Sequence, residues 1–157
     1  MLPAMRRALA LAVAGVVALG GCGGGATERG DVTKAVRVWT AYMADGNARE
    51  MCARMTPAAQ EEMLNYAQAY TAIPPSASCV VNAVRFIRKL PANGLRQARD
   101  ADVDQIHIEG SVATVRMAHG GPNEVVLRRQ GGAWKIDHAF RRGWRLLGAP
   151  SFGLTGG

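Results

Sequence analysis

The 157-residue chain has few of the residues that carry metal or catalytic chemistry, with only three cysteines and three histidines. The histidines lack His-x-x-x-His spacing, and neither Cys52 nor Cys79 has a Cys-x-x-Cys partner, so a zinc site is disfavoured. Asp102-x-Asp104 resembles the start of a calcium-binding loop, but His107 stands where that loop needs glycine. The Gly-x-Ser-x-Gly and Gly-Lys signatures of serine hydrolases and phosphate-binding loops are also missing. We therefore expect no metal and no cofactor.

The apolar run near the start of the chain is too short for a permanent transmembrane helix. It extends from Ala8 to Leu19, which is 12 residues, whereas a spanning helix needs roughly 20. The run follows Arg6 and Arg7, and no acidic residue precedes Glu28. A basic segment followed by a short apolar run is the order of a secretory signal, which predicts export.

The signal ends in Leu19-Gly20-Gly21-Cys22, which resembles the lipobox of bacterial lipoproteins. The resemblance implies that residues 1–21 are removed and that Cys22 receives a diacylglyceryl group. It also implies a location on the extracytoplasmic face of the cell membrane, where two or three acyl chains anchor a protein stably. We expect the glycine-rich residues 22–30 to form a flexible tether. The alternative is an apolar helix that contains a cysteine by chance.

Acidic residues are fewer than basic ones, 12 against 19, and the net charge is +7. Removing residues 1–21 takes away two arginines and no acid, so the mature charge is +7 minus 2, or +5. This positive charge favours an anionic lipid or an acidic envelope polymer as a partner. The alternative is that the charge only keeps the protein soluble. The basic cluster of residues 141–145 is either a membrane-surface patch or a solvated terminal segment. Export argues against a nucleic-acid partner.

Once Cys22 is assigned to lipid, Cys52 and Cys79 can pair only with each other. An exported protein folds in an oxidising compartment, where disulfides form and persist. The bridge would close a loop of 28 residues, for which loop-closure entropy gives about 3.6 kcal/mol of stabilisation. We expect this disulfide to join two helices.

Apolar residues spaced three and four apart predict helices in the first half of the mature chain. The expected helices cover Val32 to Ala44, Ala48 to Met55, Pro57 to about Ile73, and Cys79 to Leu90. Thr56 and Ser78 are suited to cap two of them, and Pro91 ends the last. After Asn93-Gly94 the period becomes two, which predicts strands at Gln105 to Ile108, Ser111 to Met117, Glu124 to Arg129, and Ala133 to Asp137.

Helices followed by strands indicate an α+β domain over residues 31–142, with a C-terminal tail over residues 143–157. We expect the N-terminal helices to pack on a curved antiparallel sheet of about four strands. Three features resemble the small NTF2-like (SnoaL-like) lipoproteins of the bacterial envelope: residues 38–57, Ser78-Cys79, and the hairpin-rich residues 110–137. The resemblance implies a cone-shaped fold with an apolar pocket. Its relatives include steroid-isomerase-like enzymes, polyketide cyclases and non-catalytic modules, so fold alone does not decide function.

Two sets of side chains are candidates for a site in such a fold. The first set consists of large apolar side chains that either line a hydrophobic pocket or belong to the ordinary core: Trp39, Tyr42, Met63, Tyr66 and Trp134. The ionisable candidates are Asp102, Asp104, His107, His119, Asp137 and His138. Strand alternation assigns His107 to the outer face, His119 lies beside glycines, and Asp137-His138 reads as a solvated strand end. We assign none of them a catalytic role.

The sequence thus favours a non-catalytic, lipid-anchored envelope domain that binds a hydrophobic ligand or a partner protein. The alternative is an isomerase- or cyclase-type enzyme with an acid or base in its pocket. A third hypothesis, a structural accessory of a membrane complex, predicts an apolar surface patch instead of a pocket.

Overall fold

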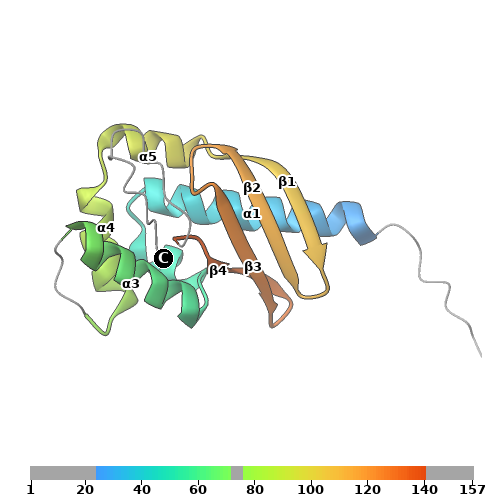
Figure 1. Ribbon diagram of the computed structural model, residues 1–157, viewed down its shortest axis with the longest axis horizontal. Coiled ribbons are helices and arrows are strands. Elements are labelled where there is room, and N and C mark those ends of the chain that lie inside the picture. Colours follow the sequence, from blue (N-terminus) through green and yellow to red (C-terminus); the bar gives the residue numbers. More distant parts are fainter. Residues whose placement is uncertain (1–23, 72–75, 141–157) are drawn as a thin grey trace, which may run out of the picture.

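The computed structural model describes residues 24–71 and 76–140, in which helices precede strands (Figure 1). The expected leader, Cys22, the helix end at Ile73, and the C-terminal tail lie outside these residues. The helices are α1 (Gly24–Ala44), α2 (Ala48–Ala53), α3 (Pro57–Thr71), α4 (Cys79–Lys89) and α5 (Ala92–Arg99). The strands are β1 (Asp102–Glu109), β2 (Val112–His119), β3 (Glu124–Gln130) and β4 (Ala133–His138).

The four strands form one antiparallel sheet in the order β1-β2-β3-β4. Each strand pairs with its neighbour in sequence, so close turns suffice to connect them. Within β2, Ala113, Val115 and Met117 are buried, whereas Arg116 between them is exposed. Period-two alternation therefore gives the sheet an apolar face and a polar face. The α+β class and the four-stranded antiparallel arrangement expected from the sequence are confirmed.

Helix α1 runs behind the sheet in Figure 1 and contributes the centre of the core. Its residues Val32, Val36, Trp39 and Met43 are fully buried, at the three- and four-residue spacing that places them on one helix face. Figure 1 shows α3 and α4 beside the end of the sheet that lies away from the start of α1. One continuous core therefore joins both layers, with Phe86 from α4 and Leu127 from β3 among its largest buried side chains.

Helix α1 begins at Gly24, well before the start expected at Val32, which corrects the boundary of the predicted tether. Residues 24–30 are helical despite Gly24, Gly25 and Gly30. Glycine lowers helix propensity by about 1 kcal/mol per residue, but tertiary contacts can override it. One such contact is the ion pair between Glu28 and Arg129 of β3, with 3.0 Å between Oε1 and Nη1.

Helix α5 was not expected, because Asn93-Gly94 looked like a break before the strands. The Asn93 side chain instead accepts a hydrogen bond from the Gly94 N–H at 3.0 Å, inside the first turn of the helix. Ala98 is buried, and Arg99 forms an ion pair with Asp45 at the end of α1. Packing on α1 thus outweighs the unfavourable propensity of Gly94.

The β2–β3 loop meets α5 through Gly120. Its φ of +79° is in the left-handed region, and a Cβ there would lie 2.2 Å from the Gln97 carbonyl oxygen. Only glycine allows this close approach between two backbones.

The outer edge of β4 is covered by the segment between α2 and α3. The Ile136 N–H donates to the Arg54 carbonyl, and the Thr56 N–H donates to the Ile136 carbonyl, both at 2.8 Å. The helix expected to reach Met55 therefore ends at Ala53, because Arg54 to Thr56 extend beside β4. Thr56 and Ser78 cap α3 and α4 as predicted, accepting from the N–H groups of Ala59 and Val81.

Candidate functional site

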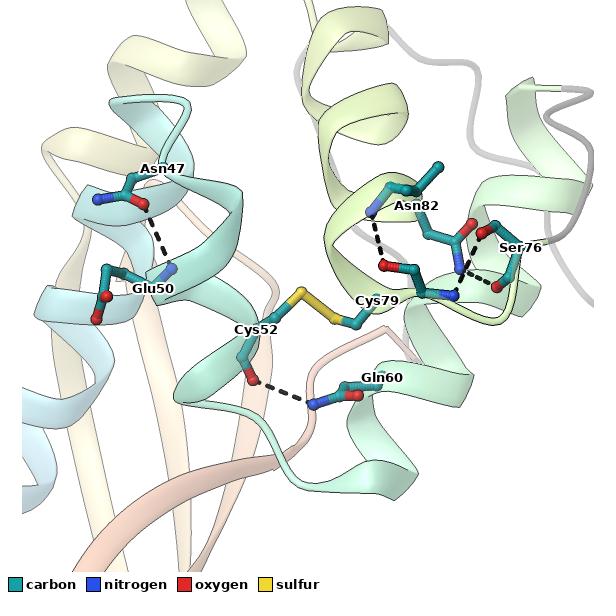
Figure 2. Close-up of a disulfide and its surroundings, with 9 residues drawn as sticks. Asn47, Glu50, Cys52, Gln60, Ser76, Cys79 and Asn82 are labelled. Carbon is teal, nitrogen blue, oxygen red and sulfur yellow. Dashed lines mark hydrogen bonds between the residues drawn. A yellow bond between two sulfur atoms is a disulfide. The ribbon is translucent and has the colours of Figure 1, made fainter.

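A disulfide joins Cys52 of α2 to Cys79 at the start of α4, as the sequence predicted (Figure 2). The two Cα atoms are 6.1 Å apart. Polar contacts order the flanking chain: the Gln60 amide donates to the Cys52 carbonyl at 3.1 Å, and the Asn82 amide donates to the Ser76 carbonyl at 2.7 Å. The bridge therefore ties the short α2 helix to α4 across two well-defined helix ends.

The five side chains predicted to line a hydrophobic pocket lie together, but they pack as core. Trp39 and Met63 are fully buried, and Trp134 is 5% exposed. Tyr42 and Tyr66 are half-buried and pack against the same cluster. The Tyr66 ring contacts Phe86 edge-on, with 5.9 Å between centroids. None of these five side chains lines either of the two open cavities that are described below.

The end of β4 holds a buried ionic cluster where the sequence predicted solvated residues. Val126 pairs with His138 and Leu127 with Ile136, so Asp137 is an extra residue that bulges out of the pairing. Its side chain is buried as a result, and this corrects the expectation for Asp137. The Thr56 hydroxyl donates to its Oδ1 at 2.8 Å, and Arg128 Nε donates to its Oδ2 at 3.1 Å.

Burial acts to raise the pKa of Asp137, but its hydrogen bonds act in the opposite direction. The Thr56 hydroxyl and the Arg128 guanidinium stabilise the charged carboxylate, and the nearby His138 adds to this. The net result is a pKa below the ordinary value of 3.8. The carboxylate is therefore held in its ionised form by contacts within the protein.

His138 lies between two carboxylates in the same cluster. Its Nδ1 is 3.4 Å from Glu62 Oε1 and its Nε2 is 3.6 Å from Asp137 Oδ2. Glu62 of α3 also accepts the backbone N–H groups of Ala139 and Phe140 through Oε2, at 2.9 and 3.0 Å. These bonds fix the chain as it leaves β4, and neither open cavity includes Asp137, His138 or Glu62. The geometry assigns this cluster a structural role.

The larger of these two cavities, about 640 Å³, is an open cleft at the β1 edge of the sheet, lined by residues of α1 and of β1 to β3. Helix α1 contributes Arg29, Thr33 and Arg37, which follow one another at four-residue spacing on one face. Strands β1 to β3 contribute side chains of both charges; those with charge or a titratable ring are Asp104, His107, Arg116 and Glu124. Asp104 and His107 were candidates from the sequence, but the arginines were not; their only signal was the Arg29-x-x-x-Thr33-x-x-x-Arg37 spacing.

The remaining sequence candidates lie at the surface. Asp102 forms a 2.7 Å ion pair with Arg37, and this hydrogen bond is the main reason that its pKa lies below 3.8. His107 points away from the core, as predicted, and its Nε2 lies 2.9 Å from Glu109 Oε1. His119 is exposed beside the second cavity, about 460 Å³, which Asp100 and Asn123 also line.

The described residues hold neither a candidate metal cluster nor a candidate membrane-spanning helix. Residues 24–71 and 76–140 contain no cluster of three histidine, cysteine or carboxylate side chains placed to hold a metal ion. Over the same part of the chain, no helix combines the length and the apolar character needed to cross a membrane.

The fold and its surface define a small α+β protein with one internal disulfide and an open cleft of mixed charge. Comparison of the chain with known protein families, with curated proteins and with solved structures finds no match.

Proposed function

We propose that this chain is a lipid-anchored protein of the bacterial cell envelope that acts by binding, without catalysing a reaction. The proposed location rests on the lipobox-like residues 19–22, and the proposed fold type rests on the likeness to NTF2-like lipoproteins. In this proposal, Cys22 carries the lipid and the α+β domain lies on the extracytoplasmic side.

The disulfide is the observation that carries the proposed location. Cys52 and Cys79 come from different helices, and their side chains meet in a bonded geometry within the folded core. Such a bridge persists in an oxidising compartment and is rare in the reducing cytosol. A disulfide in a chain that begins with a lipobox-like leader is consistent with export followed by retention at the membrane.

The packing favours surface binding over an interior ligand pocket. Trp39, Met63 and Trp134 are buried members of the core cluster, and cores of this kind are close-packed, so we expect an apolar ligand to need to displace them. The open cleft, in contrast, presents polar and charged groups to solvent without rearrangement. We therefore place binding at the cleft beside α1 and modify the expected hydrophobic ligand to a polar one.

The substitution Cys22→Ser tests the anchor. We expect wild type to incorporate labelled fatty acid and to lose residues 1–21, whereas Cys22→Ser accumulates as an unlipidated precursor. Cys79→Ser is the matched control, because it removes a thiol outside the lipobox and should be lipidated normally. Mass spectrometry of the mature N-terminus reads out both events. A wild-type protein that retains Met1 to Gly21 would contradict the proposal.

A further inference from the structure

The sheet has one covered edge and one free edge. Residues 54–56 cover the edge at β4, whereas no described residue outside β2 forms a backbone–backbone hydrogen bond with β1. The pairing of β1 with β2 is shifted at Asp104 and then regular from Gln105 to Glu109. Because alternate residues of an edge strand direct their N–H and C=O groups outward, this stretch presents unpaired backbone groups.

The open cleft follows this free edge. Five consecutive residues, Val103 to His107, line it, although the side chains of a strand alternate between two faces. The cleft therefore borders the backbone of β1 and opens on both faces of the sheet. Its other lining residues agree with this position, because α1 packs on the core face and the Arg116 side chain lies on the outer face.

The first turns of α1 provide a surface beside the free edge. Figure 1 shows that α1 starts beyond β1 and then passes behind the sheet. Arg29, Thr33 and Arg37 line the cleft from this side. An extended chain that adds to β1 would lie about 4.8 Å from it, so its core-face side chains would pack against these turns of α1.

Two contacts show how α1 runs relative to β1. Arg37 pairs with Asp102 at the start of β1, with 2.7 Å between Nη2 and Oδ1. Glu28 pairs with Arg129, and the Arg129 N–H donates to the Ser111 carbonyl, two residues after the end of β1. The cleft-lining side of α1 thus runs from the end of β1 toward its start.

Unpaired charges of opposite sign stand at the two ends of this surface. Arg29 lies toward the end of β1 and Asp104 toward its start; both are exposed, and neither has an ion-pair partner among the described residues. Ile106 and Ile108 are half-buried and pair with core-facing residues of β2. A strand placed beside β1 would meet a negative charge, two isoleucines and then a positive charge.

We propose that the free edge of β1 docks an extended segment of a partner protein, which adds to the sheet as an antiparallel strand. The segment places a basic residue opposite Asp104, a β-branched residue opposite Ile106, and an acidic residue opposite Ile108 and beside Arg29. Cross-strand pairs of these kinds stabilise a sheet. In an antiparallel pair the acidic residue comes first, so the pattern is acidic-x-β-branched-x-basic. The proposal rests on the binding role proposed for the cleft and is independent of the lipid anchor.

A second copy of the chain is a less suitable occupant of this edge. Helix α1 extends past β1 in Figure 1, so two copies joined through β1 would bring both α1 helices to the same side of the joint. In addition, β1 contains no lysine or arginine to place opposite Asp104. A single strand contributed by another protein has neither disadvantage.

The test is an NMR titration of the mature, lipidated protein in neutral detergent micelles with two blocked peptides of equal composition. The probe is Thr-Glu-Thr-Val-Thr-Lys-Thr, and the control, Thr-Lys-Thr-Val-Thr-Glu-Thr, exchanges its two charges. We expect the probe to shift the amide signals of residues 103–109. Its Kd should be about tenfold lower than that of the control, because two exposed charge pairs change from attraction to repulsion.

A third peptide tests whether the backbone carries the interaction. It is the probe with N-methyl groups on the valine and on the threonine that follows. Consecutive N–H groups of a strand point to opposite sides, so one of the two methyl groups must face β1. We expect binding at least about tenfold weaker than that of the probe, since a ladder hydrogen bond is lost and the strands are held apart.

A charge exchange in the protein tests the assigned direction. Arg29→Glu combined with Asp104→Lys should reverse the preference, so that the control peptide binds about tenfold more tightly than the probe. Arg88→Glu on α4 is the matched control, because it changes an exposed arginine outside the cleft and should retain the original preference. Circular dichroism checks that each variant is folded.

Several results would overturn the proposal. These are unshifted β1 signals with the probe, equal affinity for the two charge patterns, or undiminished binding of the N-methylated peptide. Signals of β1 that shift with protein concentration alone would assign the edge to a second copy and overturn the partner segment. Lipidation of the wild type is measured separately, so each of these results leaves the proposed anchor standing.

Discussion

At the scale of single residues, the Asp137 carboxylate contributes to how the stability of the protein changes in acid. It is buried, ionised, and bonded to Thr56 and Arg128, and its pKa lies below the ordinary value of 3.8. A lowered pKa in the folded state means that the unfolded chain binds a proton more readily. Its contribution to stability is therefore complete above pH 3.8 and is lost as the pH falls from there through the folded-state pKa.

Asp137→Asn should reduce the free energy of unfolding at neutral pH by about 2 kcal/mol, because the Thr56 and Arg128 hydrogen bonds lose their charged acceptor. The variant should also lose less stability than wild type when the pH is lowered below 4, since it has no carboxylate there to protonate. Urea unfolding over a pH series measures both effects. Asp104→Asn is the control, because Asp104 is exposed and has no ion-pair partner among the described residues. Parallel acid profiles for wild type and Asp137→Asn would refute the role assigned to Asp137.

At the scale of the elements, the Cys52–Cys79 bridge holds α2, a helix of six residues, against α4. A helix this short is unstable alone, so its position depends on the contacts that tie it down. Reduction, or the paired change Cys52→Ser and Cys79→Ser, should lower the free energy of unfolding by about 3.6 kcal/mol. Urea unfolding with and without reductant measures the difference. A reductant effect that persists in the double variant would show that it does not come from this bridge.

The elements that the sequence predicted best are those with a local and unbroken period. The strands of the meander were found because Val112 to Met117 and Glu124 to Arg129 alternate and end at glycine turns. Helix α5 and the first turns of α1 were missed because their glycines locally indicate a break. Contacts with distant residues stabilise both helices: Arg99 of α5 pairs with Asp45, and Glu28 of α1 pairs with Arg129. Helix propensity describes a segment in isolation, so it contains no information about the tertiary contacts that the segment makes in the fold.

The site was predicted less well than the fold for the same physical reason. Cys52 and Cys79 could be paired because only one pairing was left. The cleft gathers residues from α1, β1, β2 and β3, which stand as far apart in sequence as Arg29 and Glu124. Only the three-dimensional fold brings these charges together. Asp137 was misassigned because a single bulge in β4 turns a strand-end residue inward, and no local pattern marks that bulge.

At the scale of the whole molecule, the two layers share one core, and the five side chains of the predicted pocket belong to it or pack against it. Met63 is the sharpest test, because it is fully buried and belongs to the cluster that also contains Trp39 and Trp134. A core methionine loses its dispersion contacts and leaves a void when it is truncated. Truncation of a residue that lines an open ligand pocket only enlarges the space that solvent fills.

Met63→Ala should therefore lower the free energy of unfolding by about 2–5 kcal/mol, the range for large-to-small changes in packed cores. Val81→Ala on α4 is the control, because Val81 is 39% exposed and its truncation should change stability by no more than about 0.5 kcal/mol. Urea unfolding of both variants gives the comparison. A near-neutral Met63→Ala that gains affinity for apolar ligands would restore the interior pocket and move the binding function away from the charged cleft. A loss in the expected range, with Val81→Ala unchanged, would support the proposed surface site over an interior pocket.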